Sequence, residues 1–229
     1  MEIKKNTMAN ENDETVAVSP AQKTIDFIAK RYNLDLSKGS PTEPFELDLC
    51  RKLVLPTLFK ELGFNKGVEI GVLDGIYSAI LCETNPDLKL YSVDKWEVYP
   101  IYKNRRRQWQ YNIFYDEAQK KLAPYKNCQI IKEWSMDAVK MFPDESLDFV
   151  FIDANHDFEH ITEDIAQWGK KVRVGGIISG HDFGDSPRSL FCCVETVVRA
   201  WTKAKRINPW FILNSALTVN ERSWMWVKQ

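Results

Sequence analysis

Apolar residues along this chain gather into short runs that alternate with longer amphipathic stretches. Five runs are nearly all apolar, as expected of strands buried on both faces of a sheet; they cover residues 67–71, 88–94, 128–132, 147–153 and 174–181. Helical spacing of apolar positions is found over residues 76–84, 106–122, 135–141, 157–171 and 187–204. This alternation predicts an α/β fold, with a parallel sheet and helices on both of its faces.

The pattern changes near the C-terminus. Residues 210–213 and 224–227 form two strand-like runs, and no full helix separates them. Two such runs close together in the chain predict a hairpin at the end of the sheet.

The first part of the chain has a different character. Residues 1–19 lack periodicity, so we expect a disordered tail. Helical spacing returns at residues 20–32 and 45–62, and the Gly- and Pro-containing stretch between them is expected to be a linker. We therefore predict the tail, a helical cap over residues 20–65 and a main domain over residues 66–229.

A glycine-rich loop follows the first strand of the main domain. Glu69, Gly71 and Gly75 form the pattern E-x-G-x-x-x-G, and a helix is predicted to begin directly after it. Glycine lets a ligand approach the backbone closely, and a helix start offers free N–H groups to a polar or anionic group. The dinucleotide-binding pattern G-x-G-x-x-G does not occur there. The loop alone leaves both a ligand site and an ordinary turn open.

Acids and histidines stand at the ends of the later strands. Asp94 ends the second strand, where an acid can bind ribose hydroxyls in nucleoside-binding α/β folds. Asp153 and His156 end the run DFVFIDANH, and His181 and Asp182 end the run GGIISGHD. Since the carboxyl ends of parallel strands share one edge of the sheet, we expect these side chains to converge.

These four motifs, in this order, resemble the class I S-adenosylmethionine-dependent methyltransferases. The sequence is most similar to the branch of small-molecule and sugar O-methyltransferases, over roughly residues 45–229. The resemblance implies a Rossmann-like, doubly wound, mostly parallel sheet of seven strands, with an antiparallel last strand and helices on both faces.

The same resemblance implies a binding site for S-adenosylmethionine. Glu69 would lie beside the methionine portion, Gly71 and Gly75 would shape the floor, and Asp94 would hold the ribose. Further cofactor contacts are implied for residues that flank the adenine or read its edge, and for the acid that ends the fourth strand: Lys95, Trp96, Ser135, Met136, Asp137 and Asp153. Each of these residues alone could instead be a helix cap or a loop residue; Ser135 is itself a good N-cap.

A divalent metal is also implied by the resemblance. Catechol-type O-methyltransferases hold Mg²⁺ with an acid after strand four and an acid–amide pair after strand five. Asp153 matches the first ligand, and His181 and Asp182 stand where the pair would lie. Because a histidine shifts the preference from Mg²⁺ toward Mn²⁺, Fe²⁺ or Zn²⁺, both the presence and the identity of the metal stay open.

His156 is the candidate general base. An imidazole near neutral pKa can remove a hydroxyl proton, which a neutral alcohol needs before it attacks a sulfonium. Its position just after Asp153 puts it beside the expected site, and both residues are candidate catalytic groups. A structural role for this histidine is the alternative, and His160 is a secondary candidate on the same helix face.

Composition and charge limit the partners and the cellular location that we expect. The chain has 229 residues and a formal net charge of -1, which provides no general attraction to nucleic acid or to an anionic membrane. No run is apolar enough to span a bilayer, and the start of the chain lacks the apolar core of a secretory signal. Five cysteines without a C-x-x-C pair argue against a disulfide framework or a zinc site. We therefore expect a cytoplasmic protein.

Residues 96–115 combine aromatic and basic side chains. They could form a lid or a substrate wall, because aromatic rings stack on sugars and arginines bind phosphates. The alternative is a helix with one apolar and one solvated basic face.

The function expected from the sequence is methylation of a hydroxyl on a small polar acceptor, with a sugar or sugar-containing metabolite as the first candidate. No nucleic-acid or membrane partner is expected, and a homo-oligomer stays open. The main alternative is a non-catalytic adenosyl-binding module that keeps the fold. Base methylation and nicotinamide chemistry are disfavoured because their motifs are missing.

Overall fold

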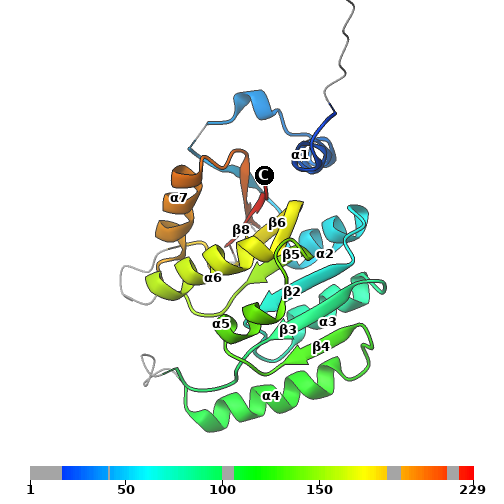
Figure 1. Ribbon diagram of the computed structural model, residues 1–229, viewed down its shortest axis with the longest axis vertical. Coiled ribbons are helices and arrows are strands. Elements are labelled where there is room, and N and C mark those ends of the chain that lie inside the picture. The colour runs from blue at the N-terminus through cyan, green and yellow to red at the C-terminus, as the bar shows by residue number, and fades with distance from the viewer. Residues whose placement is uncertain (1–16, 41, 100–105, 185–191, 216–221) are drawn as a thin grey trace, which may run out of the picture.

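A single eight-stranded sheet forms the centre of the protein (Figure 1). The computed structural model describes residues 17–40, 42–99, 106–184, 192–215 and 222–229. The strands in chain order are β1 (Phe45–Leu47), β2 (Lys66–Ile70), β3 (Lys89–Val93), β4 (Cys128–Ile131), β5 (Leu147–Ile152), β6 (Val172–Gly180), β7 (Trp210–Asn214) and β8 (Arg222–Val227).

The strand order is β1-β7-β8-β6-β5-β2-β3-β4. All neighbouring strands are parallel except β8, which is antiparallel to both β6 and β7. The predicted α/β fold, the C-terminal hairpin and the antiparallel last strand are therefore confirmed. β3 lies on one side of β2 and β5 on the other, so the chain changes direction beside β2, where doubly wound folds bind their ligands.

The predicted strand number was wrong, because the sheet has eight strands instead of seven. The additional strand is β1, whose three residues pair in parallel with β7 from Phe45 opposite Phe211 to Leu47 opposite Leu213. We had assigned these residues to the start of a helix. Their burial alternates as in a strand, with Glu46 exposed and Leu47 buried, but three residues are too few for a period of two to be distinguished from helical spacing.

Seven α-helices are found among the described residues. They are α1 (Pro20–Arg31), α2 (Arg51–Glu61), α3 (Ile76–Thr84), α4 (Gln108–Leu122), α5 (Ser135–Ala138), α6 (Phe158–Lys171) and α7 (Val194–Lys205). The stretch predicted as one helix at 135–141 is α5 followed by a 3₁₀ turn, Val139–Met141. Another 3₁₀ turn, Leu36–Lys38, lies in the expected linker.

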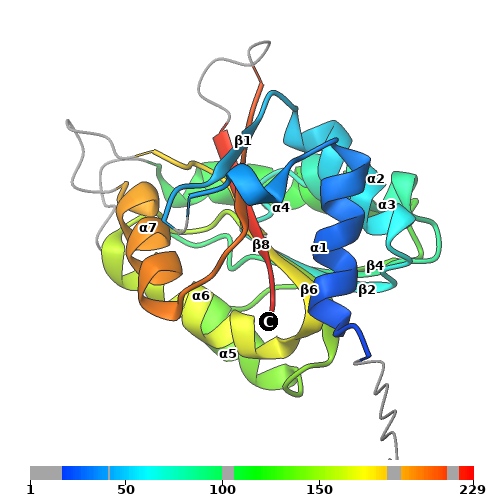
Figure 2. The same ribbon diagram turned by 90° about the horizontal axis from the view of Figure 1, so that it is seen from above.

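Helices cover both faces of the sheet, as Figure 2 shows from above. On one face, Val150 and Ile152 belong to a buried cluster with residues of α5, α6 and α7. On the other face, Phe149 and Phe151 belong to a cluster with residues of α1, α2 and α3. Successive residues of β5 thus point to opposite sides, and burial on both faces explains why this strand is almost entirely apolar.

Some predictions fall outside the described residues: the tail over residues 1–16, the centre of the aromatic and basic segment at 100–105, and residues 187–191 of the last predicted helix. Within the described part of the chain, no helix has both the length and the apolar character needed to cross a membrane.

Candidate active site

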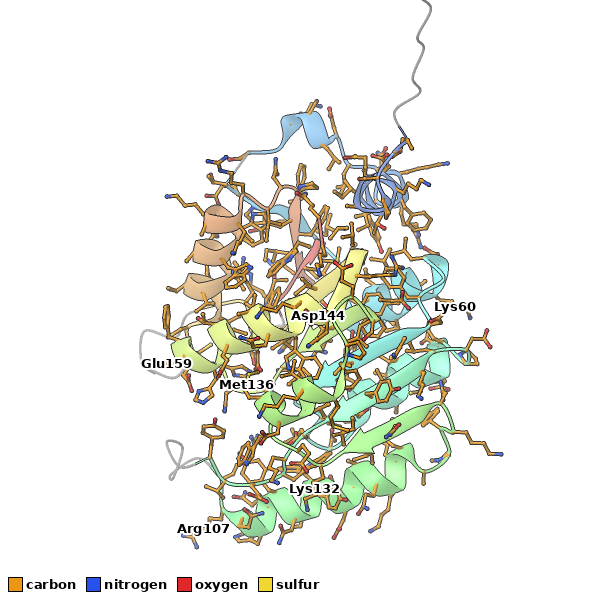
Figure 3. The ribbon with its side chains drawn as sticks, in the orientation of Figure 1. Lys60, Arg107, Lys132, Met136, Asp144 and Glu159 are labelled. Atoms are coloured by element: carbon orange, nitrogen blue, oxygen red, sulfur yellow. The ribbon has the colours of Figure 1, made fainter. Side chains whose placement is uncertain are left out.

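A cavity of about 510 Å³ opens at the carboxyl ends of the central strands. It is lined by residues from the ends of β2, β3 and β5, from the loop after β6, and from the starts of α2 and α5. Figure 3 labels Met136, one of the lining residues, at the start of α5 among the side chains between sheet and helices. The volume lies within the range of small-molecule and cofactor sites.

The glycine loop forms one wall of this cavity. Gly71 has φ +89°, and a Cβ built on it would lie 2.1 Å from the carbonyl oxygen of Asp153. Gly75 has φ +79° in the left-handed region and caps the start of α3. A side chain at position 71 would separate β2 from the end of β5, so glycine is required there for packing as well as for conformation.

Asp94 holds the glycine loop in place. Its Oδ2 atom accepts the backbone N–H groups of Val72 and Leu73, both at 3.0 Å, and its Oδ1 atom accepts that of Trp96 at 2.8 Å. Burial raises the pKa of this carboxyl, and the backbone donors oppose that rise. Asp94 lines the cavity, so ribose binding stays a prediction, and its carboxylate also organises the loop, which the sequence did not indicate.

Only some of the residues that we predicted to contact the adenine line the cavity. Lys95, Ser135 and Met136 line the cavity. Trp96 does not line it: the ring is buried beneath the loop, where Nε1 donates to the carbonyl oxygen of Leu73 at 2.6 Å. Asp137 also stands outside the lining and pairs with Lys140 at 2.8 Å.

Ser135 is not the N-cap of α5, because that position is taken by Trp134. Its hydroxyl instead donates to Asp164 and accepts the indole N–H of Trp168 at 2.8 Å. Asp164 is buried and lines the cavity, and burial raises the pKa of its carboxyl to about 7. Asp164, from α6, therefore lies beside Ser135 in the cavity wall, whereas Asp137, the residue expected there, does not line the cavity.

A buried polar chain runs away from the cavity wall. Glu69 accepts a hydrogen bond from Ser78, whose hydroxyl is hydrogen-bonded to that of Ser92 at 2.7 Å. Ser92 is in turn 3.3 Å from the thiol of Cys128. Burial raises the pKa of Glu69 well above its usual value, while the bond from Ser78 lowers it. Glu69 lines the cavity from β2, and its contact with the methionine portion of the cofactor stays a prediction.

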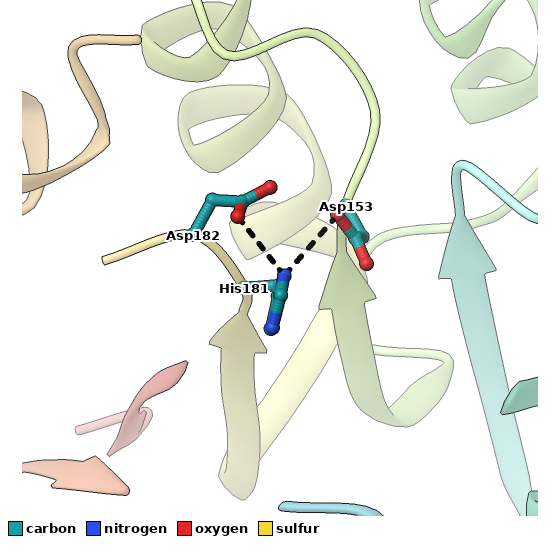
Figure 4. A group of neighbouring side chains, drawn as sticks. All are labelled: Asp153, His181 and Asp182. Carbon is teal, nitrogen blue, oxygen red and sulfur yellow. Dashed lines mark ion pairs between the residues drawn. The ribbon is translucent and has the colours of Figure 1, made fainter. Parts of the chain in front are cut away.

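Three predicted metal ligands meet at the ends of β5 and β6 (Figure 4). Asp153, His181 and Asp182 each offer a ligand atom, and these atoms lie within 4.8 Å of one another. His181 Nδ1 is 3.8 Å from Asp153 and 3.3 Å from Asp182. Two carboxylates and an imidazole at this spacing fit a divalent ion, with Mn²⁺, Fe²⁺ or Zn²⁺ suited better than Ca²⁺.

His156 joins the same cluster from the loop before α6. Its Nε2 atom lies 3.5 Å from Asp153 and 3.2 Å from Asp182, and its carbonyl oxygen accepts the N–H of Cys193 at 2.7 Å. Burial would raise the pKa of Asp182, but the hydrogen bond from His181 and the charge of His156 keep that pKa below its usual value. The candidate base and the candidate metal ligands thus form one group.

The comparison with protein families decides the identity. Residues 68–183, just over half of the chain, match the family described as Methyltransferase domain. The chain belongs to this family. The resemblance to class I S-adenosylmethionine-dependent methyltransferases, which rested on four motifs, is confirmed. No curated protein matches the sequence significantly.

Solved structures share the fold of this methyltransferase. One is the O-methyltransferase TomG from Streptomyces achromogenes, involved in tomaymycin synthesis and solved with S-adenosylmethionine, at 18% identity and a TM-score of 0.57, covering 92% of this chain and 90% of that chain. Another is an O-methyltransferase from Bacillus cereus in complex with S-adenosylhomocysteine, at 16% identity and a TM-score of 0.54, covering 94% of each chain. The fold is that of S-adenosylmethionine-dependent O-methyltransferases.

The methyltransferase cavity also contains two residues that the sequence did not single out and one from the aromatic and basic stretch. Arg51 and Tyr77 line it from α2 and α3, and Tyr99 lines it from the segment after β3. Tyr99 lies within the aromatic and basic stretch of residues 96–115, for which the sequence allows either a substrate wall or a helix with a solvated basic face. For Arg51 the sequence offers no signal, because nothing in the pattern of α2 indicates which side chain would reach the cavity.

Proposed function

We propose that this methyltransferase transfers a methyl group from S-adenosylmethionine to a hydroxyl of a small polar acceptor, with a sugar or sugar-containing metabolite as the first candidate. The observation that carries the proposal is the meeting of Asp153, His156 and Asp182 beside the glycine loop, in the wall of a single cavity. This arrangement supports a proton acceptor next to the expected methyl donor.

The cofactor would extend along the carboxyl ends of β2 and β3. The presence of Glu69 and Gly71 in the cavity wall supports a site for its methionine portion, and that of Ser135, Met136 and Asp164 supports an adenine subsite. The bound cofactor supplies an electrophilic methyl group on a sulfonium. The protein positions the acceptor, excludes water and accepts the proton.

His156 would take the proton from the acceptor hydroxyl at Nε2. The neighbouring carboxylates of Asp153 and Asp182 stabilise the imidazolium that results, because they lie 3.5 and 3.2 Å from Nε2. The positive charge of the imidazolium thus forms next to two carboxylates. They offset its repulsion by the positive sulfonium of the cofactor.

A divalent ion would fit beside the same base. Asp153, Asp182 and Nδ1 of His181 would hold the ion, and it would supply polarisation of the acceptor hydroxyl, lowering the pKa of that group. A metal and His156 are two separate ways to activate the hydroxyl, so their contributions have to be measured separately.

The proposal is tested by turnover. The purified protein is incubated with S-adenosylmethionine, Mn²⁺ or Mg²⁺ and a panel of free sugars and sugar nucleotides, and formation of S-adenosylhomocysteine is measured with and without a chelator. We expect formation that depends on at least one acceptor and is lowered by the chelator. Binding of the cofactor without turnover on any acceptor would favour the non-catalytic adenosyl-binding module.

A further inference from the structure

Arg51 is a buried cation at the wall of the cavity. It is the first residue of α2, and its side chain is only 8% exposed. The guanidinium carbon lies 4.9 Å from the ring centroid of Tyr77 and 5.3 Å from that of Phe151. The two rings hold the planar group in a fixed orientation, with cation–π attraction as a partial substitute for water.

The hydrogen-bond donors of this guanidinium are largely unused. Within the described part of the chain, Nε and the first terminal nitrogen of Arg51 are buried without a hydrogen-bond partner. The other terminal nitrogen is 4.0 Å from Asp153 Oδ2, which is an ion pair but too long for a hydrogen bond. The buried hydroxyl of Tyr77 likewise finds no partner among the described residues.

Unpaired buried donors are costly, particularly when one of them carries a charge. Both Arg51 and Tyr77 line the cavity, so these buried donors lie in its wall, next to the space that a ligand would occupy. A guanidinium fork matches the two oxygens of a carboxylate, and a phenol can add a further donor to the same group. The ligand chemistry that satisfies these atoms is therefore a carboxylate.

Two acids stand next to this pair. Glu69 lines the same wall, where burial raises the pKa of its carboxyl and the charge of Arg51 lowers it, and Asp153 lies 4.0 Å from the guanidinium. A wall that holds these donors next to carboxyl groups complements a carboxylate and an ammonium carried by one molecule. An α-amino acid group has this arrangement of charges.

We propose that Arg51 and Tyr77 bind the carboxylate of an α-amino acid group, the methionine end of S-adenosylmethionine, while Glu69 and Asp153 face its ammonium. This inference rests on the proposed function for the identity of the ligand. An acidic acceptor would present the same carboxylate chemistry, so the test has to separate the two sources.

Calorimetry compares two ligands on three proteins. The ligands are S-adenosylhomocysteine and 5′-methylthioadenosine, which lacks the amino acid end. In Arg51→Met we expect the affinity for S-adenosylhomocysteine to fall by about 10–100-fold, the usual effect of losing hydrogen bonds to a charged group. The affinity for 5′-methylthioadenosine should stay within about twofold of wild type, since that ligand makes no such bonds. The control Arg31→Met removes an exposed guanidinium that pairs with Glu61, and it should change neither affinity.

The melting temperature of the ligand-free protein is a second measurement, which distinguishes a ligand-binding arginine from one that only stabilises the fold. Because Arg51→Met removes a buried, poorly paired charge, the melting temperature of the ligand-free variant should be unchanged or higher than that of wild type. Tyr77→Phe should lower the affinity for S-adenosylhomocysteine by a smaller factor, about threefold to tenfold, since one neutral donor is lost.

Acetate identifies the source of the carboxylate. Acetate at high millimolar concentration should raise the melting temperature of ligand-free wild type but not of Arg51→Met. If acetate still stabilises wild type but not Arg51→Met when both are saturated with S-adenosylhomocysteine, and the substitution leaves the affinity for that ligand unchanged, the carboxylate belongs to the acceptor.

If wild type binds neither adenosyl ligand, the proposed function fails while the acetate experiment still tests the site. Equal loss of both adenosyl ligands in Arg51→Met, or no effect of the substitution on any ligand, would overturn the inference.

Discussion

The hydroxyl of Tyr99 lies 2.5 Å from Nε2 of His160. The other ring nitrogen of His160, Nδ1, lies 2.6 Å from the buried carboxylate of Asp157, which fixes it as the protonated one. Nε2 therefore accepts, and the Tyr99 hydroxyl donates. This chain of hydrogen bonds ties the segment after β3 to the start of α6, and Tyr99 and His160 both line the cavity.

Removing the Tyr99 hydroxyl should weaken cofactor binding. Tyr99→Phe loses the bond to His160 but keeps the ring, which packs edge-on against Trp134 with centroids 5.0 Å apart. We expect the affinity for S-adenosylhomocysteine to fall by about fivefold, equivalent to one neutral hydrogen bond. Calorimetry measures this, with Tyr125→Phe as the control because that ring does not line the cavity. An unchanged affinity in Tyr99→Phe would mean that the link between the two segments does not support the cofactor.

Two variants distinguish activation by a general base from activation by a metal ion. If His156 takes the acceptor proton, His156→Ala should lower turnover by about 10²–10⁴-fold, the usual range for loss of a general base, with little change in cofactor affinity. Turnover of wild type should rise with pH as the imidazole becomes neutral.

A different result would assign activation of the acceptor hydroxyl to a bound metal ion. Near wild-type turnover in His156→Ala, together with loss of turnover in Asp153→Asn, would make a bound ion the activator and His156 structural. Direct titration of the ligand-free protein with Mn²⁺ supplies a readout independent of activity, since Asp182→Asn should weaken that binding. Retained activity in both His156→Ala and Asp153→Asn would remove both assignments.

Asp164 should make stability depend on pH. Its pKa is raised to about 7 in the folded protein by burial, against about 4 for an unperturbed aspartate. A raised pKa means that the folded state keeps a proton that the unfolded state has lost, so its contribution is full below about pH 4 and is lost as pH rises through about 7. The free energy of unfolding should therefore fall over this window, by an amount on the order of a few kcal/mol.

Asp164→Asn isolates this contribution because the amide cannot ionise. Urea unfolding between pH 5 and pH 8 should show a shallower decline in the variant than in wild type. Part of the decline should remain, because burial also raises the pKa values of Glu69 and Asp94. Identical slopes in the two proteins would show that Asp164 ionises normally in the folded state.

Gly71 should tolerate no side chain. Its φ of +89° is strained for any other residue, and an added Cβ would collide with the backbone of Asp153. We expect Gly71→Ala to cost about 2 kcal/mol or more of unfolding free energy in urea titrations. Gly63→Ala is the matched control: its φ is +67° but nothing lies within 4 Å of the added Cβ, so the cost should be near 1 kcal/mol. Equal costs would show that the loop moves to admit the methyl group.

The sequence predicted the central strands and the convergence of their terminal residues because both follow from local patterns. Asp153 and Asp182 follow strands that are parallel neighbours, and His156 lies in the loop directly after Asp153, so their meeting follows from topology. The helix α3 begins and ends where its periodicity and the preceding glycine indicate, at Ile76 and Thr84.

Other features depend on tertiary contacts that no local pattern encodes. Whether Trp96 faces the cavity or the core is decided by its bond to Leu73, and the exposure of Asp137 depends on the orientation of α5. The position of Arg51 results from the packing of α2 on Tyr77 and Phe151, residues distant in the sequence. Strand β1 is stabilised by pairing with β7 rather than by its own propensity.

A crystal structure with S-adenosylhomocysteine tests the account most directly. The account predicts one ligand per chain across the carboxyl ends of β2 and β3, with its sulfur facing Asp153 and His156, its carboxylate on Arg51 and its adenine beside Ser135 and Asp164. No ligand density after soaking at saturating concentration, or density outside this cavity, would contradict it.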